Sequence, residues 1–121
     1  MRRLRLLALP TLAIMLVAAT ACAPAAASIE VTEETTVVDV RTPAEYAGGH
    51  LDGTVNLYVS AADFATELAE LDPSAEYVVY CQSGNRSSRA VAQMEQAGFT
   101  SVEDAGGISS AAAATGLAVV D

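Results

Sequence analysis

The sequence predicts an α/β domain with a mainly parallel sheet of four to five strands and helices on both faces. Short β-branched runs alternate along the chain with segments of helical periodicity. The runs are apolar at consecutive positions, which is typical of strands that helices bury on both faces. The chain shows no internal repeat, and its 121 residues leave room for one domain with one core.

The elements of the first half follow in order. A weak edge strand is expected at 29–31, and "TVVDV", 36–40, forms a buried strand that runs into a turn. "TPAEYA", 42–47, begins a short helix with a threonine N-cap and a proline at the first helical position. Glycines then separate this helix from a second apolar strand around 55–57.

The second half repeats the alternation of strands and helices. The expected elements are a helix at 60–71 with Ser60 as its cap, a third strand at 76–80, a helix at 87–97 and a fourth strand at 99–103. The alanine-rich tail, 106–121, is expected to form a short helix or a loose cover and to be the least ordered part.

The first 21 residues are predicted to be an export signal, with a basic start, an apolar stretch and small residues at the end. The apolar stretch is shorter than the roughly 20 residues of a spanning helix, and Arg2-Arg3 is a weak hint of twin-arginine export. "ATAC", 19–22, resembles a bacterial lipobox with alanine in the usual leucine position, which implies that Cys22 is acylated. Cleavage at A-x-A after residue 21 or 27 is the alternative. Residues 22–28 then form a tether to a domain at 29–121.

Removal of the leader makes the domain strongly acidic. Three arginines then stand against fifteen acidic residues, a net charge of −12. Such a domain repels nucleic acid and anionic lipid surfaces, so Arg41, Arg86 and Arg89 are candidates for a local anion site. The alternative reading is that the acidity only keeps an exported protein soluble.

Cys81 is the candidate catalytic residue, because it stands at the carboxyl end of a predicted strand, where ligands of such sheets bind. The loop after it offers what stabilises a thiolate: backbone N–H groups freed by a glycine, a helix N-terminus, and arginine charge that Arg89 supplements. The predicted loop residues are Gln82, Ser83, Gly84, Asn85, Arg86 and Ser87. The alternative is a small buried cysteine at a strand end.

The spacing within this loop favours sulfur over phosphate chemistry. Four residues separate Cys81 from Arg86, one fewer than in the loop of cysteine phosphatases. A tighter ring of N–H groups should fit a sulfur atom better than a tetrahedral phosphate. If Cys22 is acylated, Cys81 also has no partner for a disulfide in its own chain.

Three segments together resemble the rhodanese family, in the family's order: "VVDVRTPAEYAGGHLDGTVNL", "VVYCQSGNRSSRAVAQMEQAGF" and "VEDAGG". Size and leader are similar to those of small periplasmic rhodaneses. The resemblance implies a rhodanese-like fold in which Cys81 takes the outer sulfur of a small anionic donor such as thiosulfate and releases sulfite. The resulting persulfide then passes its sulfur to cyanide or a thiol.

The same resemblance implies supporting roles for Asp39, Arg41 and His50, which match the family's D-x-R and G-H positions. Asp39 is expected to pair with Arg41 or to orient the loop. His50, the only histidine, is expected to hydrogen-bond across the following turn as a structural residue. The chain departs from many members in two ways. It has no tryptophan after its "GG", which affects the expected packing of the last helix, and its segment before Thr36 is short, which implies that the usual opening helix is missing.

Three other functions stay open on the sequence alone. They are a persulfide carrier or partner-binding module with little turnover, a phosphatase or arsenate reductase, and, as the weakest, a dithiol oxidoreductase. We expect no cofactor and no metal, because one histidine and one free thiol cannot complete a ligand set.

Overall fold

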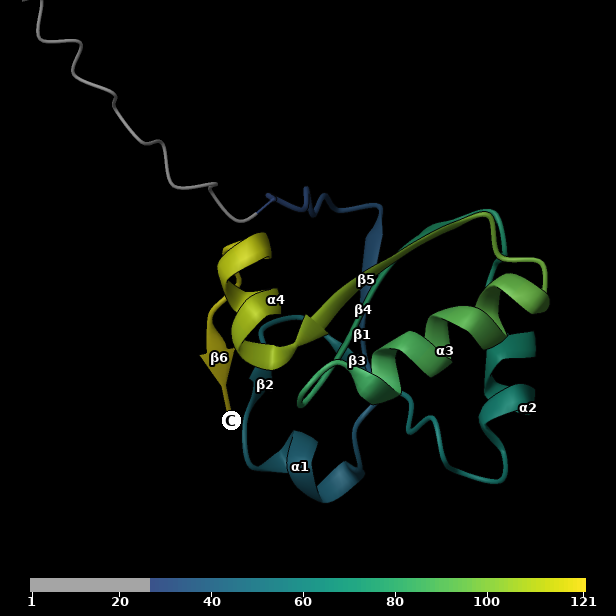
Figure 1. Ribbon diagram of the computed structural model, residues 1–121, viewed down its shortest axis with the longest axis horizontal. Helices are drawn as coiled ribbons and strands as arrows, with labels where there is room; N and C mark the ends of the chain where they lie inside the picture. Colours follow the sequence, from purple (N-terminus) through teal and green to yellow (C-terminus); the bar gives the residue numbers. More distant parts are fainter. Residues whose placement is uncertain (1–26) are drawn as a thin grey trace, which may run out of the picture.

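The computed structural model describes residues 27–121 (Figure 1). Its centre is a four-stranded parallel sheet in the order β3-β1-β4-β5. The strands are β1 (Thr35–Asp39), β3 (Val55–Asn56), β4 (Glu76–Cys81) and β5 (Ser101–Gly107). The predicted α/β class with a mainly parallel sheet is therefore confirmed.

Helices cover both faces of the sheet, as the apolar strands predict. The helices are α1 (Pro43–Ala47), α2 (Phe64–Ala69), α3 (Asn85–Gln96) and α4 (Ile108–Thr115). α2 and α3 lie on one side and α4 on the other (Figure 1). Val38 and Val79 belong to the core beneath α2 and α3, whereas Val37 and Val78 face the core beneath α4. In the described part of the chain, no helix is long and apolar enough to cross a membrane.

Residues 29–31 do not form the expected edge strand. The backbone N–H of Ile29 donates to the carbonyl of Ala114 at 2.9 Å, and the Ile29 side chain is buried in the core beneath α4. Both edges of β1 are already paired, with β3 and β4. The segment before β1 therefore packs on a helix rather than beside that strand.

The helix expected at 60–71 is shorter than the sequence suggests. It starts only at Phe64, so Ser60 lies in the turns before it and the N-cap position belongs to Asp63. Phe64 and Leu68 are buried, as their helical spacing predicts. The periodicity therefore predicted the buried face of this helix correctly, but the prediction of Ser60 as its N-cap was wrong.

The alanine-rich tail is built into the fold. It forms α4 and a final strand, β6 (Val119–Val120), which pairs antiparallel with β2 (His50–Leu51). Ala111 is fully buried against the sheet, because a methyl side chain lets the helix approach closely. The expected short helix is therefore confirmed, whereas the expectation that this tail is the least ordered part was wrong.

Candidate active site

The cysteine loop connects the second central strand to the longest described helix. β4 ends at Cys81, and α3 begins at Asn85, two residues earlier than expected. Gly84 makes this short connection possible, because its φ of 102° lies in the left-handed region that suits glycine. Only residues 82–84 therefore separate Cys81 from the N-terminus of α3, where a helix has unpaired backbone N–H groups.

The Cys81 sulfur is buried and surrounded by hydrogen-bond donors. The backbone N–H of Gly84 donates to Sγ at 3.0 Å. The Cys81 thiol donates to the Ser87 hydroxyl oxygen at 3.5 Å, and that hydroxyl donates to the Gly84 carbonyl at 3.0 Å. Burial is the largest single effect and raises the pKa of the Cys81 thiol. Hydrogen bonds with the Ser87 hydroxyl and with the N–H groups of Ser87, Gly84 and Ser83 together lower the pKa by more than burial raises it, so the pKa lies below its ordinary value. The loop therefore favours a thiolate.

The two glycines at the end of β5 form the support on which the loop rests. β5 is shifted in register against β4 after Val79, so that Cys81 lies opposite Gly107. A Cβ atom at Gly107 would lie 2.6 Å from the carbonyl oxygen of Gln82. The second glycine of "GG" is therefore required by the close approach of the loop, a role that the sequence alone did not reveal.

Asp39 and Arg41 form a buried pair that also holds the loop. The Arg41 Nη2 group lies 2.7 Å from the Asp39 carboxylate, and the two side chains are 4% and 0% exposed. Arg41 Nη1 donates to the Gln82 side-chain oxygen at 3.0 Å, and Nη2 also donates to the Gly49 carbonyl at 2.6 Å. The hydrogen bond to Asp39 raises the pKa of Arg41. The expected pairing of Asp39 with Arg41 is thus present, and it is Arg41 rather than Asp39 that contacts the loop.

His50 is held against α1. Its Nδ1 lies 2.9 Å from the Tyr46 carbonyl oxygen, and its ring stacks on the Tyr46 ring at a centroid distance of 3.8 Å. The hydrogen bond therefore runs back to the preceding helix, and the expectation that it spans the following turn was wrong. This places His50 in a structural setting at the edge of β2.

Arg86 does not project a free charge into the loop. Its Nη1 and Nη2 groups donate to the two carboxylate oxygens of Glu45 at 2.7 and 2.9 Å. The hydrogen bond from Arg86 is the main cause that lowers the pKa of Glu45 to about 2. Glu45 was noticed in the sequence only as a residue of the first turn of a helix, and its pairing partner lies 41 residues away.

The remaining predicted residues lie at the rim or outside the described part. Arg89 is exposed and donates to the Ser60 hydroxyl at 3.2 Å rather than to the loop. Gln82, Ser83 and Asn85 are exposed, whereas Ser87 is fully buried. Cys22 and the predicted export signal, residues 1–21, fall outside residues 27–121. Within that range, no group of three or more His, Cys, Asp or Glu side chains is arranged to hold a metal ion.

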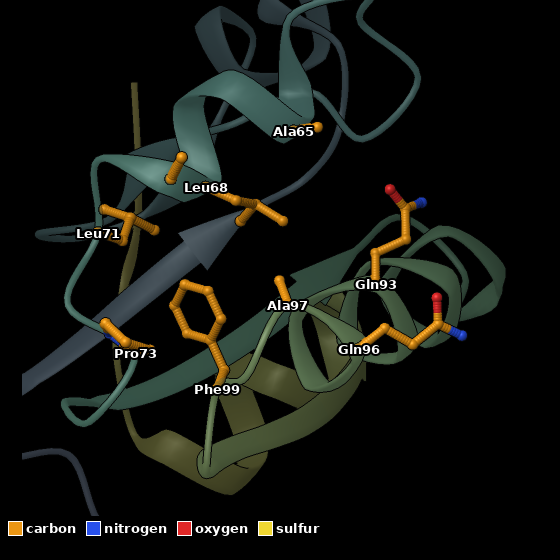
Figure 2. Close-up of a pocket in the computed structure, with 9 residues that line it drawn as sticks. Ala65, Leu68, Leu71, Pro73, Gln93, Gln96, Ala97 and Phe99 are labelled. Atoms are coloured by element: carbon orange, nitrogen blue, oxygen red, sulfur yellow. The ribbon is translucent and has the colours of Figure 1, made fainter.

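Two hollows in the surface lie away from the cysteine loop. An apolar groove of about 450 Å³ opens between α2 and α3, with Leu68, Leu71 and Phe99 pointing into it (Figure 2). A second cleft of about 590 Å³ lies at the amino ends of β1, β4 and β5 and is lined in part by Glu30, Glu34, Glu76 and Glu103. Neither includes a loop residue, so the chemistry of Cys81 takes place elsewhere.

Comparison with known proteins identifies the family of this chain. Residues 25–114 match the rhodanese-like domain family. The chain belongs to the rhodanese family. Thiosulfate sulfurtransferase 16 of Arabidopsis thaliana is 38% identical to it over 90 residues, which are 66% of this chain and 75% of that protein. A sulfurtransferase of Allochromatium vinosum is 35% identical over 89 residues, which are 74% of this chain and 81% of that protein.

Solved rhodanese structures share the fold. A structure described as a rhodanese with anions from E. coli has a TM-score of 0.60 and 29% identity, over 72% of this chain and 98% of that chain. With these relatives, the chain is an enzyme of the rhodanese type. The missing tryptophan does not prevent the last helix of this rhodanese from forming, since α4 packs through Ala111.

Proposed function

We propose that this rhodanese is an exported sulfurtransferase that moves sulfane sulfur from a thiosulfate-like donor to a cyanide or thiol acceptor through a persulfide on Cys81. The observation that carries the proposal is the buried Cys81 sulfur with a lowered pKa, beneath the N-terminus of α3. Of the two relatives described above, one is named a thiosulfate sulfurtransferase and the other a sulfurtransferase.

The first half-reaction needs only a thiolate and a leaving group. The Cys81 thiolate attacks the outer sulfur of thiosulfate, a bond forms between Sγ and that sulfur, and the sulfur–sulfur bond of the donor breaks. The electron pair of the broken bond leaves with sulfite, so no proton is transferred. This agrees with the side-chain hydrogen bonds of Cys81, which in the described residues are made with Gly84 and Ser87 and not with a histidine.

The second half-reaction restores the enzyme. Cyanide or a thiolate attacks the terminal sulfur of the persulfide, and the electron pair of that sulfur–sulfur bond returns to Sγ as a thiolate. The N–H group of Gly84, which donates to Sγ at 3.0 Å, stabilises the anion in both steps because it is already oriented before the reaction. One solved structure is described as a rhodanese with anions from E. coli, which supports anion binding by this rhodanese.

The proposed location depends on the leader. A basic start, an apolar stretch and "ATAC" support export followed by acylation of Cys22. The test is fractionation of cells expressing the full chain. The wild type is expected in the membrane fraction and Cys22→Ala in the soluble fraction. Equal fractionation of the two would refute the lipid anchor.

The proposed chemistry is tested by thiocyanate production from thiosulfate and cyanide, with Cys81→Ser as the control. Mass spectrometry of the intact protein after thiosulfate treatment should show a gain of one sulfur atom that Cys81→Ser lacks. Thiocyanate production no higher than in that control would refute the proposed sulfurtransferase activity. A persulfide without turnover would instead identify a sulfur carrier, and release of phosphate from an aryl phosphate at comparable efficiency would identify a phosphatase.

A further inference from the structure

The side chain of Gln82 ties the cysteine loop to the end of β1. Arg41, which follows that strand, donates from Nη1 to the Gln82 side-chain oxygen at 3.0 Å. A guanidinium carries hydrogen-bond donors and no acceptor, so the amide of Gln82 has to turn its oxygen toward Arg41. The hydrogen bond therefore fixes the orientation of an otherwise exposed side chain.

Arg41 is a rigid anchor for this bond. Its Nε and Nη2 groups bind the Asp39 carboxylate at 2.7 to 3.0 Å, and Nη2 also donates to the Gly49 carbonyl at 2.6 Å. Its guanidinium lies 5.8 Å from the centre of the Tyr80 ring, and its backbone carbonyl accepts from the Asn56 side chain at 2.9 Å. A buried side chain that is bound at so many points has little freedom to follow the loop if the loop moves.

The backbone of Gln82 is held from the side of β5. A Cβ atom at Gly107 would lie 2.6 Å from the Gln82 carbonyl oxygen and 3.2 Å from the carbonyl carbon, so the oxygen is directed at β5. In a planar trans peptide the N–H of the next residue, Ser83, points the opposite way, away from β5. The contact with β5 and the bond from Arg41 therefore fix the plane of this peptide from two sides.

This peptide is the first of the short connection that carries the hydrogen-bond donors of Cys81. Only residues 82–84 lie between β4 and α3, and the N–H of Gly84 donates to Sγ at 3.0 Å. Because peptide planes are rigid, a rotation about Gln82 also turns the N–H group of Gly84. A hydrogen bond weakens steeply as it bends, so the donor geometry at the sulfur depends on how Gln82 is held.

We propose that Gln82 is a positioning residue of this rhodanese: by accepting the hydrogen bond from Arg41, it keeps the Gly84 N–H directed at the sulfur in the thiolate and in the persulfide. The proposal rests on the sulfurtransferase function proposed above. It assigns the Gln82 side chain a task that is separate from binding of the substrate.

The test follows alkylation of Cys81 by iodoacetamide as a function of pH, with mass spectrometry of the peptide that contains Cys81. Gln82→Met removes the amide oxygen and keeps an unbranched side chain. Gln82→Glu keeps an oxygen acceptor for Arg41, and about 0.5 M sodium chloride in all samples screens its added charge. Gln96→Met is the matched control, because it makes the same exchange at an exposed position of α3.

In Gln82→Met, the alkylation profile should move to higher pH, and the rate at pH 7 should fall about threefold to tenfold, because the thiolate loses a well-directed donor. The value of kcat/KM for thiosulfate should fall by a similar factor. Gln82→Glu should restore the alkylation profile of the wild type, and Gln96→Met should leave both measurements within about twofold of wild type. An unchanged profile in Gln82→Met, or an equally large change in Gln82→Glu, overturns the proposal.

Urea denaturation separates positioning from support of the fold. A link that only supports the fold would lower the free energy of unfolding of Gln82→Met and leave the alkylation profile of the folded protein unchanged, which also overturns the proposal. Alkylation requires no sulfur donor. A wild type that forms no thiocyanate would therefore refute the sulfurtransferase function, while the alkylation profiles still decide the role of Gln82.

Discussion

At the scale of single residues, the reactivity of Cys81 comes from hydrogen-bond donors rather than from a free cation. The hydroxyl of Ser87 and the backbone N–H groups of Ser83, Gly84 and Ser87 lower its pKa against the opposing effect of burial. The arginine of the loop is matched by Glu45. The loop therefore stabilises a thiolate through oriented dipoles, whose effect is strong in a buried site and little screened by salt.

Replacement of Ser87 by alanine should make the thiol less acidic. Because the hydroxyl lowers the pKa of Cys81, its loss raises that pKa, and a smaller fraction of thiolate is present at neutral pH. We expect kcat/KM for thiosulfate at pH 7 to fall about tenfold. The pH dependence of iodoacetamide alkylation measures the shift directly. Ser88→Ala, at an exposed position of α3, is the control, and an unchanged profile in Ser87→Ala would contradict this account of the thiolate.

Replacement of Gly107 by alanine should displace the cysteine loop. The new Cβ would meet the Gln82 carbonyl oxygen at 2.6 Å, and overpacking of this kind costs about 1–3 kcal/mol. We expect both the free energy of unfolding in urea and the rate of thiocyanate production to fall. Gly48→Ala is the matched control, because its Cβ would make only ordinary contacts of 3.5 Å or more. An equal free energy of unfolding and an equal rate of thiocyanate production in the two variants would show that β5 does not support the loop.

At the scale of elements, α1 is stabilised by contacts at its ends rather than by its own length. It has five residues, too few for an isolated helix in water. Its capping box satisfies the first N–H groups, and the ion pair of Glu45 with Arg86 connects it to α3. α1 therefore joins the cysteine loop to the segment that carries His50 and β2.

This connection between α1 and α3 should weaken in acid. The pKa of Glu45 is lowered to about 2, mainly by its hydrogen bond from Arg86, whereas an unfolded glutamate titrates near 4.3. The pair therefore contributes stability that is complete above the unfolded pKa and is lost as the pH falls from about 4.5 through about 2. For a pair that is 25% and 31% exposed, we expect a loss of about 1 kcal/mol.

Urea denaturation at a series of pH values checks this prediction. Wild type should lose about 1 kcal/mol more than Glu45→Gln between about pH 5 and about pH 2. Glu103→Gln, an exposed carboxylate of β5, should follow the wild type. A wild-type curve parallel to that of Glu45→Gln would mean that the ion pair contributes nothing to stability.

The elements that the sequence predicted are those with local signals. β-branched runs identified β1 and β4, and the threonine and proline of 42–47 identified α1. The two-residue strands β2 and β6 exist only because distant segments pair, so no local pattern marks them. The same holds for the pair of Glu45 with Arg86, and for the need for glycine at Gly107, which depends on how closely the Gln82 carbonyl approaches.

At the scale of the whole molecule, a cleft lined by glutamates and the candidate catalytic cysteine lie at opposite ends of the sheet. The cleft at the amino ends of β1, β4 and β5 is lined by four glutamates, whereas Cys81 ends β4 at the carboxyl side. All fifteen acidic residues lie in the described part of the chain, with three arginines to balance them. An anionic donor therefore approaches against a repulsive overall field.

Salt should consequently speed the reaction with thiosulfate. At 0.1 M salt, repulsion between charges more than a Debye length of about 10 Å apart is largely screened. The hydrogen-bond donors at Cys81 are buried, so salt screens their effect on the thiolate much less. We expect kcat/KM for thiosulfate to rise about twofold to fivefold from low to physiological ionic strength. Sodium chloride titration in the thiocyanate assay measures it. A steady decrease of kcat/KM with rising salt would show that attraction of the donor by groups near Cys81 is stronger than its repulsion by the net negative charge of the domain.

The burial of Cys81 also sets a steric limit on the second substrate. The residue is 1% exposed, and a persulfide adds one sulfur at a bond length of about 2.05 Å. The transferable atom therefore lies only about 2 Å beyond a sulfur that is itself buried. We therefore expect acceptors with a narrow nucleophilic end to reach this atom, such as cyanide or a thiolate on an extended, unbranched chain. The depth of Cys81 in this way limits the shape of the acceptor.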